Sequence, residues 1–205
     1  MQSMSDQKIP TEKWMQIHES ILLLDFLAHE TSHNRQGINR INDRIKIVGL
    51  PPFNIVSSGL ITGLAWMILG RLYEVINDHI ADAEFNRFQK CVAEQAIRQS
   101  SISTYEELLT RYRLNINLLQ GENKSEFQQT LWKLIKHLRN AISHVDYNID
   151  LTNGDDAQDA KLVFYHRNRG TVKLSMSATV SDFFEFTKHY AVWVNSALQD
   201  KDFLM

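Results

Sequence analysis

The chain has 205 residues, a length typical of one domain and sufficient to bury a hydrophobic core. Its 22 basic and 24 acidic residues nearly balance, which excludes a protein coated in positive charge for bulk binding of nucleic acid. Any site for phosphate must therefore be local. We expect residues 1–205 to form a single domain.

The cysteine and the apolar segments indicate a cytoplasmic protein. Cys91 is the only cysteine, so it cannot form an intrachain disulfide, and its place in a helical run indicates a packing role. The apolar run 21–27 is interrupted by Asp25 and is too short to span a membrane. It also lies too far along the chain, without a basic start, to be a signal peptide. We therefore expect no membrane contact and a cytoplasmic location.

The first third of the chain predicts two helices separated by a loop. Apolar residues recur at helical spacing from Trp14 to Leu27, and this pattern fades toward Gly37. Prolines and a glycine mark a loop between 49 and 59. Residues 60–84 are at first apolar on nearly all sides, which predicts a buried central helix.

The middle of the chain is predicted to continue as helices. A further helical segment covers residues 85–99. Ser103 begins another helix, because Glu106 follows three residues later as in a capping box. After a break at 121–124, residues 125–142 form the fifth predicted helix.

Strand-like segments appear only after Tyr147. A loop at 153–156 precedes two short strands, 162–166 and 171–176, which the turn 167–170 joins into a hairpin. Thr179 and Asp182 then cap a last helix with an aromatic stripe. The fold class expected from these elements is mainly α, a helical bundle with a small β-hairpin before the C-terminal helix.

The fifth predicted helix has one apolar face and one basic face. Its apolar residues are Leu131, Leu134, Ile135, Leu138 and Ile142, and its polar face carries Lys133, Lys136, His137, Asn140 and His144. Arg139 lies at the border. On a regular helix it is separated from His144 by roughly 140 degrees around the axis. The two side chains can reach one atom only if the helix ends between them or a second copy contributes.

The segment Leu-Arg-Asn-Ala-Ile-Ser-His, residues 138 to 144, resembles the motif of HEPN-type ribonucleases, which is an arginine, a polar residue, a few more residues and a histidine. The resemblance extends through Asp146 and Tyr147 into the hairpin and is nearest to the plasmid-borne pEK499-type branch. It implies a HEPN-like bundle that forms a homodimer, so that two motifs share one cleft and cut RNA without metal or other cofactor. It also implies a toxin or defence role, with an antitoxin protein as a possible partner.

The resemblance assigns catalytic roles to three residues. His144 would act as general acid or base, because imidazole titrates near neutral pH and can exchange a proton with a ribose 2′-hydroxyl. Arg139 would stabilise the charge on the phosphoryl oxygens with its planar fork of donors. Asn140, one turn before His144, would orient the imidazole or the phosphate. The product of this chemistry would be a 2′,3′-cyclic phosphate.

Other polar residues near the motif are candidates for RNA contact or for positioning. The possible RNA contacts are Lys136, His137, Tyr147, Arg167 and Arg169. Tyr147 could instead pack on the bundle, and the hairpin turn could simply be solvated. Glu74 could orient Arg139, although pairing with Arg71 three residues earlier on the same helix is the simpler interpretation, and we favour it.

Two alternatives to a nuclease remain open. His29, Glu30 and His33 spell HExxH, which places two histidines one turn apart beside a glutamate as zinc peptidases require. The extended peptidase motif HExxHxxGxxH fails, because Gly37 is one place late and Arg40 stands at the third position after it, where a histidine would be needed. We therefore expect no metal. The stronger alternative is a catalytically silent HEPN-like module for dimerisation or RNA binding, in which Arg139 and His144 are cations favoured by a helix C-terminus.

Overall fold

The computed structural model describes residues 66–80, 82–123, 125–144, 146–150 and 161–200, with the single positions 15, 19, 22 and 47. Apart from positions 15, 19 and 22, the helix predicted from Trp14 lies outside these residues, as do the loop between 49 and 59 and the loop at 153–156.

The predicted central helix is divided into shorter elements. A π-helical turn, η1 (Trp66–Arg71), continues into α4 (Leu72–His79), and α5 (Asp82–Ser100) follows after a break. The prediction that this helix continues to Glu84 was therefore wrong, because α4 ends at His79. The break follows Asn77 and Asp78, which are exposed and poor helix formers, and Ile80 N–H closes the last turn onto Ile76 O at 2.9 Å.

The N-cap of helix α6 (Tyr105–Arg111) lies one residue later than predicted. Thr104, and not Ser103, is the N-cap, and its hydroxyl accepts from the Glu107 N–H at 3.2 Å. Glu107 in turn accepts from the Thr104 N–H at 3.0 Å, which completes a capping box. The sequence fits a capping box that starts at Ser103 or at Thr104. With Thr104 as the cap, Tyr105 and Leu108 are buried in the core.

The predicted hairpin is the centre of a larger sheet. Strands β3 (Lys161–Asn168) and β4 (Thr171–Thr179) form the hairpin, and β1 (Asn115–Leu119) and β2 (Tyr147–Asp150) flank it. The strand order is β1-β4-β3-β2, with all neighbours antiparallel. The prediction of only two strands was therefore incomplete. The turn is centred on Arg169 and Gly170, whose φ values of 50° and 78° suit a tight hairpin of the I′ kind.

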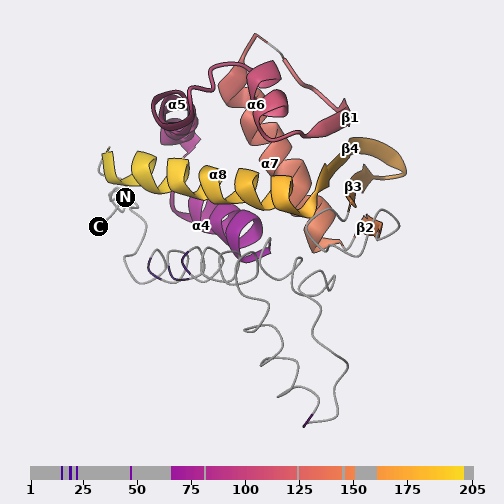
Figure 1. Ribbon diagram of the computed structural model, residues 1–205. Helices are drawn as coiled ribbons and strands as arrows, with labels where there is room; N and C mark the ends of the chain where they lie inside the picture. The colour runs from indigo at the N-terminus through magenta and orange to yellow at the C-terminus, as the bar shows by residue number, and fades with distance from the viewer. Residues whose placement is uncertain are drawn as a thin grey trace.

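Helices α7 (Phe127–Ser143) and α8 (Val180–Asp200) fill the middle of the molecule and confirm the last two predicted helices. In Figure 1, α8 crosses the bundle, α4 runs beneath α8, and the sheet lies at the N-terminal end of α8. Thr179 and Asp182 cap α8, since the Asp182 N–H donates to the Thr179 hydroxyl at 3.1 Å. The aromatic stripe of α8 is buried: Phe183, Phe186, Tyr190 and Trp193.

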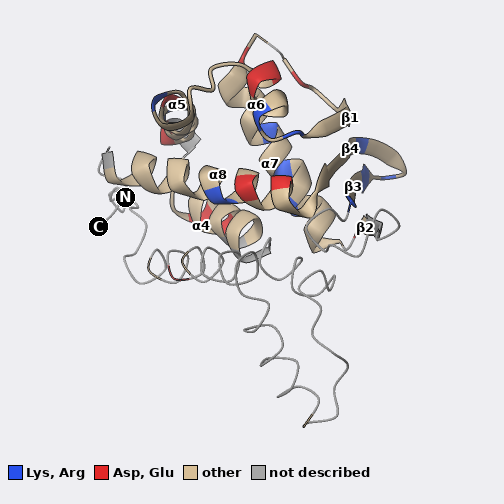
Figure 2. Cartoon of the chain, in the orientation of Figure 1, with Lys and Arg blue, Asp and Glu red and all other residues tan. Residues whose placement is uncertain are grey.

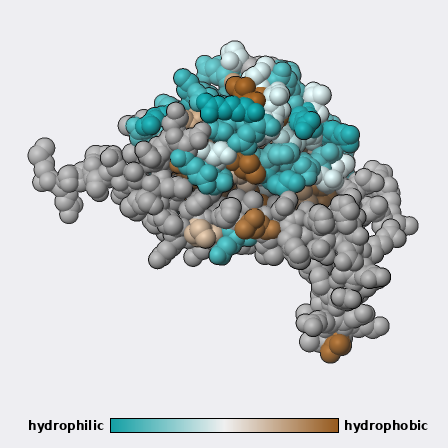
Figure 3. Space-filling model, turned by 60° about the vertical axis from the view of Figure 1, so that its left-hand side comes forward, coloured by the Kyte–Doolittle hydropathy of each residue, from teal (hydrophilic) through white to brown (hydrophobic). Residues whose placement is uncertain are grey.

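The observed class is mainly α with a small antiparallel sheet, as the sequence predicts. Cys91 is buried in the core. Figure 3 shows that the described part of one face is mainly hydrophilic, with isolated apolar residues. Within the part of the chain that the structure describes, no helix is long and apolar enough to cross a membrane.

Candidate functional site

Helix α7 presents the motif because its apolar face is anchored in the core. The five residues of its predicted apolar stripe are all buried, from Leu131 to Ile142. Burial of this stripe fixes the rotation of the helix about its axis. The opposite side consequently carries Lys136, which is exposed, and the half-buried His137, Arg139 and Asn140.

Helix α7 ends at the motif histidine. His144 is the C-cap residue, its side chain is exposed, and its backbone N–H donates to Asn140 O at 3.0 Å. The Ser143 hydroxyl donates to Arg139 O at 2.7 Å, and the Asp146 N–H donates to Ala141 O at 2.8 Å. The two backbone bonds occupy the carbonyls of Asn140 and Ala141, which a helix end otherwise leaves unsatisfied. They hold the chain as it leaves α7 toward β2.

Arg139 is held from two sides. Its Nη2 donates to Oε1 of Glu74 on α4 at 2.9 Å, and its Nη1 donates to Oδ1 of Asn140 at 3.0 Å. Its guanidinium carbon lies 5.6 Å from the ring centre of Tyr73, which stacks on Trp132. The sequence interpretation favoured Arg71 as the partner of Glu74. The structure shows the other contact considered for Glu74, that with Arg139, and the side chain of Arg71 is outside the described part.

Arg139 and His144 point in different directions on one copy of the chain. Arg139 is directed toward α4, whereas His144 is exposed at the helix end. Because α7 stays helical through Ser143, the angle of roughly 140 degrees between positions 139 and 144 is kept. The side chains at these two positions of one copy therefore leave α7 on different sides.

A histidine that the sequence analysis did not single out lies against the motif. His166 on β3 is buried, and its Nδ1 lies 2.7 Å from Nδ1 of His137 on α7. Its Nε2 lies 3.5 Å from Nδ2 of Asn140. A signal was present in the sequence, since His166 follows Leu162 and Phe164 at the alternating, inward positions of a strand. A histidine at such a position needs a polar partner.

Both members of this pair favour the neutral form. Burial, and then repulsion from His166, lower the pKa of His137 to about 4, and Lys136, Lys173 and Lys133 act in the same direction. Burial also lowers the pKa of His166, and repulsion from His144 adds to this effect. At neutral pH one Nδ1 therefore carries the shared proton and the other accepts it.

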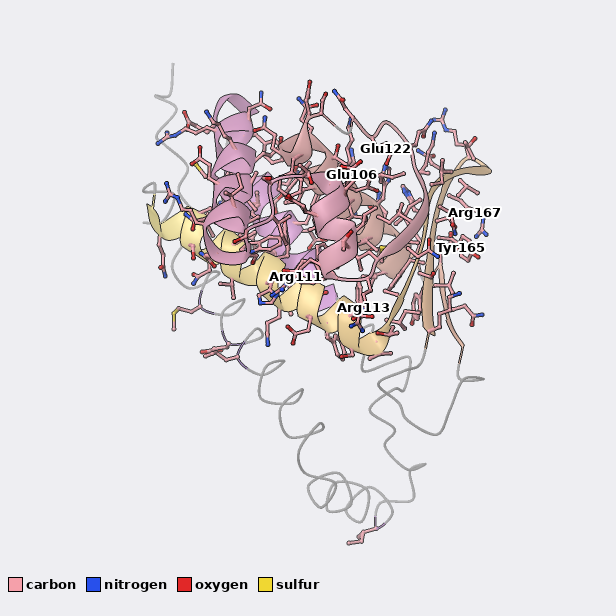
Figure 4. The ribbon with its side chains drawn as sticks, turned by 45° about the horizontal axis from the view of Figure 1, so that its top comes forward. Glu106, Arg111, Arg113, Glu122, Tyr165 and Arg167 are labelled. Atoms are coloured by element: carbon pink, nitrogen blue, oxygen red, sulfur yellow. The ribbon has the colours of Figure 1, made fainter. Side chains whose placement is uncertain are left out.

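The remaining candidates are dispersed around the sheet. Tyr147 is half-buried with its ring 6.2 Å from that of Phe164, so it packs on the core. Arg167 donates to Asp146 at 2.5 Å and lies over the Tyr165 ring at 5.0 Å. Figure 4 shows Tyr165 and Arg167 together at the outer part of the sheet. Arg169 is exposed in the hairpin turn.

Charge on the described surface is mixed, with no extended basic face. Both acidic and basic residues occur on α6 and α8, while Lys and Arg occur on β3 and β4 near the motif (Figure 2). Lys173 of β4 and Lys136 of α7 both lie close enough to act on the histidine pair, His137 and His166. The HExxH segment of His29, Glu30 and His33 lies outside the described residues.

The bundle, the sheet before the last helix and the Arg139 to His144 segment together indicate a HEPN-type domain. The chain matches the family HEPN pEK499 p136 over residues 4–201, and it belongs to that family. The resemblance inferred from residues 138 to 144 is thus confirmed. No curated protein and no solved structure matches the chain.

Proposed function

We propose that the protein is a metal-independent endoribonuclease of the HEPN type that acts as a homodimer. The observation that carries the proposal is the placement of the motif: Arg139 is held by Glu74 and Asn140, and His144 is exposed at the end of the same helix. A guanidinium has five N–H donors, so anchoring by two partners is compatible with a contact to phosphate.

The proposed reaction is attack of a ribose 2′-oxygen on the adjacent phosphorus. A bond forms between that oxygen and phosphorus, the bond from phosphorus to the 5′-oxygen breaks, and a 2′,3′-cyclic phosphate remains. His144 of one copy removes the 2′-hydroxyl proton, and its counterpart in the second copy delivers a proton to the leaving 5′-oxygen. Arg139 stabilises the negative charge that gathers on the phosphoryl oxygens, and Asn140 keeps the arginine in place.

The RNA path we propose passes the basic residues beside the motif. Lys136 on α7 is exposed next to His137, and Arg167 and Arg169 lie on the hairpin. These cations would bind backbone phosphates and give affinity that decreases with salt. Tyr147 is assigned to packing and not to base stacking, because it lies against Phe164.

The test is cleavage of a labelled RNA by the wild type, His144→Ala and Arg139→Ala, each with and without excess chelator. Arg111→Ala is the matched control, because Arg111 is an exposed arginine at the end of α6 (Figure 4). We expect cleavage that survives chelator in the wild type and control, and a loss of at least about 100-fold in the two motif variants. RNA with a single deoxyribose at the cleavage position should resist cutting.

The alternative is a silent HEPN module that binds RNA or a second copy. The observation that favours it is the ion pair of Arg139 with Glu74, which gives the arginine a structural use. A folded wild type that binds but does not cut RNA would select this alternative. Activity lost only to chelator would point to the HExxH residues His29 and His33.

The family also supports a biological proposal, a toxin or defence component that acts in the cytoplasm and is restrained by an antitoxin protein. Expression of the wild type in bacterial cells should then slow growth, and His144→Ala should relieve that effect. Equal growth with both forms would argue against this role.

A further inference from the structure

His166 connects the sheet to the motif. It is buried at the third inward position of β3, yet both of its ring nitrogens face polar groups of α7. Nδ1 meets His137 at 2.7 Å, and Nε2 meets the Asn140 amide at 3.5 Å, the outer limit of a hydrogen bond. A buried imidazole needs polar partners for its two ring nitrogens, and in this fold His137 and Asn140 of α7 supply both.

The direction of each hydrogen bond follows from the contact of Asn140 with Arg139. Oδ1 of Asn140 accepts from Nη1 of Arg139, so its Nδ2 amino group faces His166. An amide nitrogen only donates, and Nε2 of His166 must therefore be unprotonated. A neutral imidazole then carries its proton on Nδ1, which donates to Nδ1 of His137. The result is one chain of bonds from Arg139 through Asn140 and His166 to His137.

We propose that His166 is a positioning residue of the motif, whose unprotonated Nε2 holds the Asn140 amide with its oxygen turned toward Arg139. The proposal rests on the proposed function for its effect on cleavage, although the orientation itself does not depend on it. If the amide rotated by half a turn, its amino group would face the guanidinium and both contacts would be lost. Arg139 would then keep its contact with Glu74 but lose the one with Asn140.

The charges around His166 favour the neutral imidazole that this role requires. From α7 and its C-cap it faces Lys136, His137 and His144, and from β4 it faces Lys173. Asp146, which follows α7, is the one group in this set that attracts a proton toward it. Arg167, the next residue on β3, binds the Asp146 carboxylate and thereby offsets that attraction. Burial and the surrounding cations together lower the pKa of His166 and so favour its neutral ring, and the Asn140 amide selects the tautomer whose Nε2 is unprotonated.

The experiment compares His166→Phe with His166→Gln. Phenylalanine fills the same space without an acceptor, whereas the glutamine oxygen can take the place of Nε2. His189→Phe is the matched control, because His189 is a half-buried histidine on α8 that packs on Trp193. Cleavage rate and KM are measured for each variant, and thermal unfolding establishes that each is folded. We expect kcat of His166→Phe to fall about 10- to 100-fold at little change in KM, with His166→Gln and His189→Phe close to wild type.

A second measurement does not require activity. Nitrogen-15 NMR of the wild type near pH 7 reports which imidazole nitrogen carries the proton, and we expect Nδ1 of His166. The side-chain amide signals of Asn140 should shift in His166→Phe and return toward wild type in His166→Gln. A proton on Nε2, or Asn140 signals unchanged in His166→Phe, would overturn the proposal. Wild-type kcat in His166→Phe would do the same.

The two measurements separate this proposal from the proposed function. A wild type that does not cut RNA would refute the nuclease, but the tautomer and the Asn140 signals would still decide whether His166 holds the amide. Equal losses in His166→Phe and His166→Gln, with both folded, would also count against the proposal, since the acceptor would then not be what matters.

Discussion

The ion pair between Glu74 and Arg139 should couple α4 to α7 more strongly than an exposed pair of similar length. Its atoms are 2.9 Å apart, and the side chains are only 31% and 26% exposed. The gross attraction at this distance is a few kcal/mol, of which desolvation of both ions offsets a large part. We expect a coupling free energy of about 1 to 2 kcal/mol from a double-mutant cycle of Glu74→Gln and Arg139→Gln.

The comparison pair is Glu84 with Arg87 on α5, which is 2.7 Å long but 48% and 54% exposed. Solvent screening and side-chain entropy should reduce its coupling to about 0.3 kcal/mol. For each pair, urea unfolding of the wild type, the two single variants and the double variant gives the coupling free energy. Equal coupling in the two pairs, or a stronger exposed pair, would refute the reasoning that burial makes the α4–α7 contact matter.

Three further predictions concern stability. The pKa of His137 is near 4 in the folded protein, whereas an unfolded histidine titrates near 6.5, so the unfolded state binds more protons between these two pH values. The free energy of unfolding should therefore fall by about 2 kcal/mol from pH 6.5 to pH 4, after discounting for partial exposure. In urea titrations, His137→Gln should reduce this fall. Leu134→Ala removes a fully buried side chain of α7 and should cost about 2 to 5 kcal/mol by the same assay, against less than about 0.5 for the exposed Lys136→Ala. In Gly170→Ala the added Cβ meets no atom within 4 Å, but the residue would have to keep a φ of +78°. We therefore expect backbone strain to lower the free energy of unfolding by about 1 kcal/mol. An unchanged free energy of unfolding would show that the turn relaxes.

The helices that carry a clear apolar stripe were predictable from sequence. Helix α7 is found within two residues of its predicted ends, since a stripe from Leu131 to Ile142 at helical spacing depends only on local order. The cap of α8 at Thr179 is also local and is confirmed. Where two caps in adjacent registers fit equally, as at Ser103 and Thr104, packing of Tyr105 decided between them.

The edge strands were missed because their formation depends on distant partners. Strand β1 has the polar residues Asn115 and Asn117, and an irregularity between Ile116 and Leu118 interrupts its alternation. It is a strand because β4, more than fifty positions later, offers a free edge. The contacts of Glu74 with Arg139 and of His166 with Asn140 are likewise between distant segments, and spacing within one helix could not reveal them.

The order of the strands along the chain has a consequence for synthesis. Strand β1 precedes α7, but its partner β4 follows β2 and β3, so the sheet joins segments that are far apart in the chain and should form late in folding. The motif on α7 leaves the ribosome before the strand that carries His166. A nascent chain that stops near residue 160 therefore has Arg139, Asn140 and His144 but lacks His166, which contacts Asn140. Assembly of the complete motif environment is thereby delayed until β3 and β4 have been made.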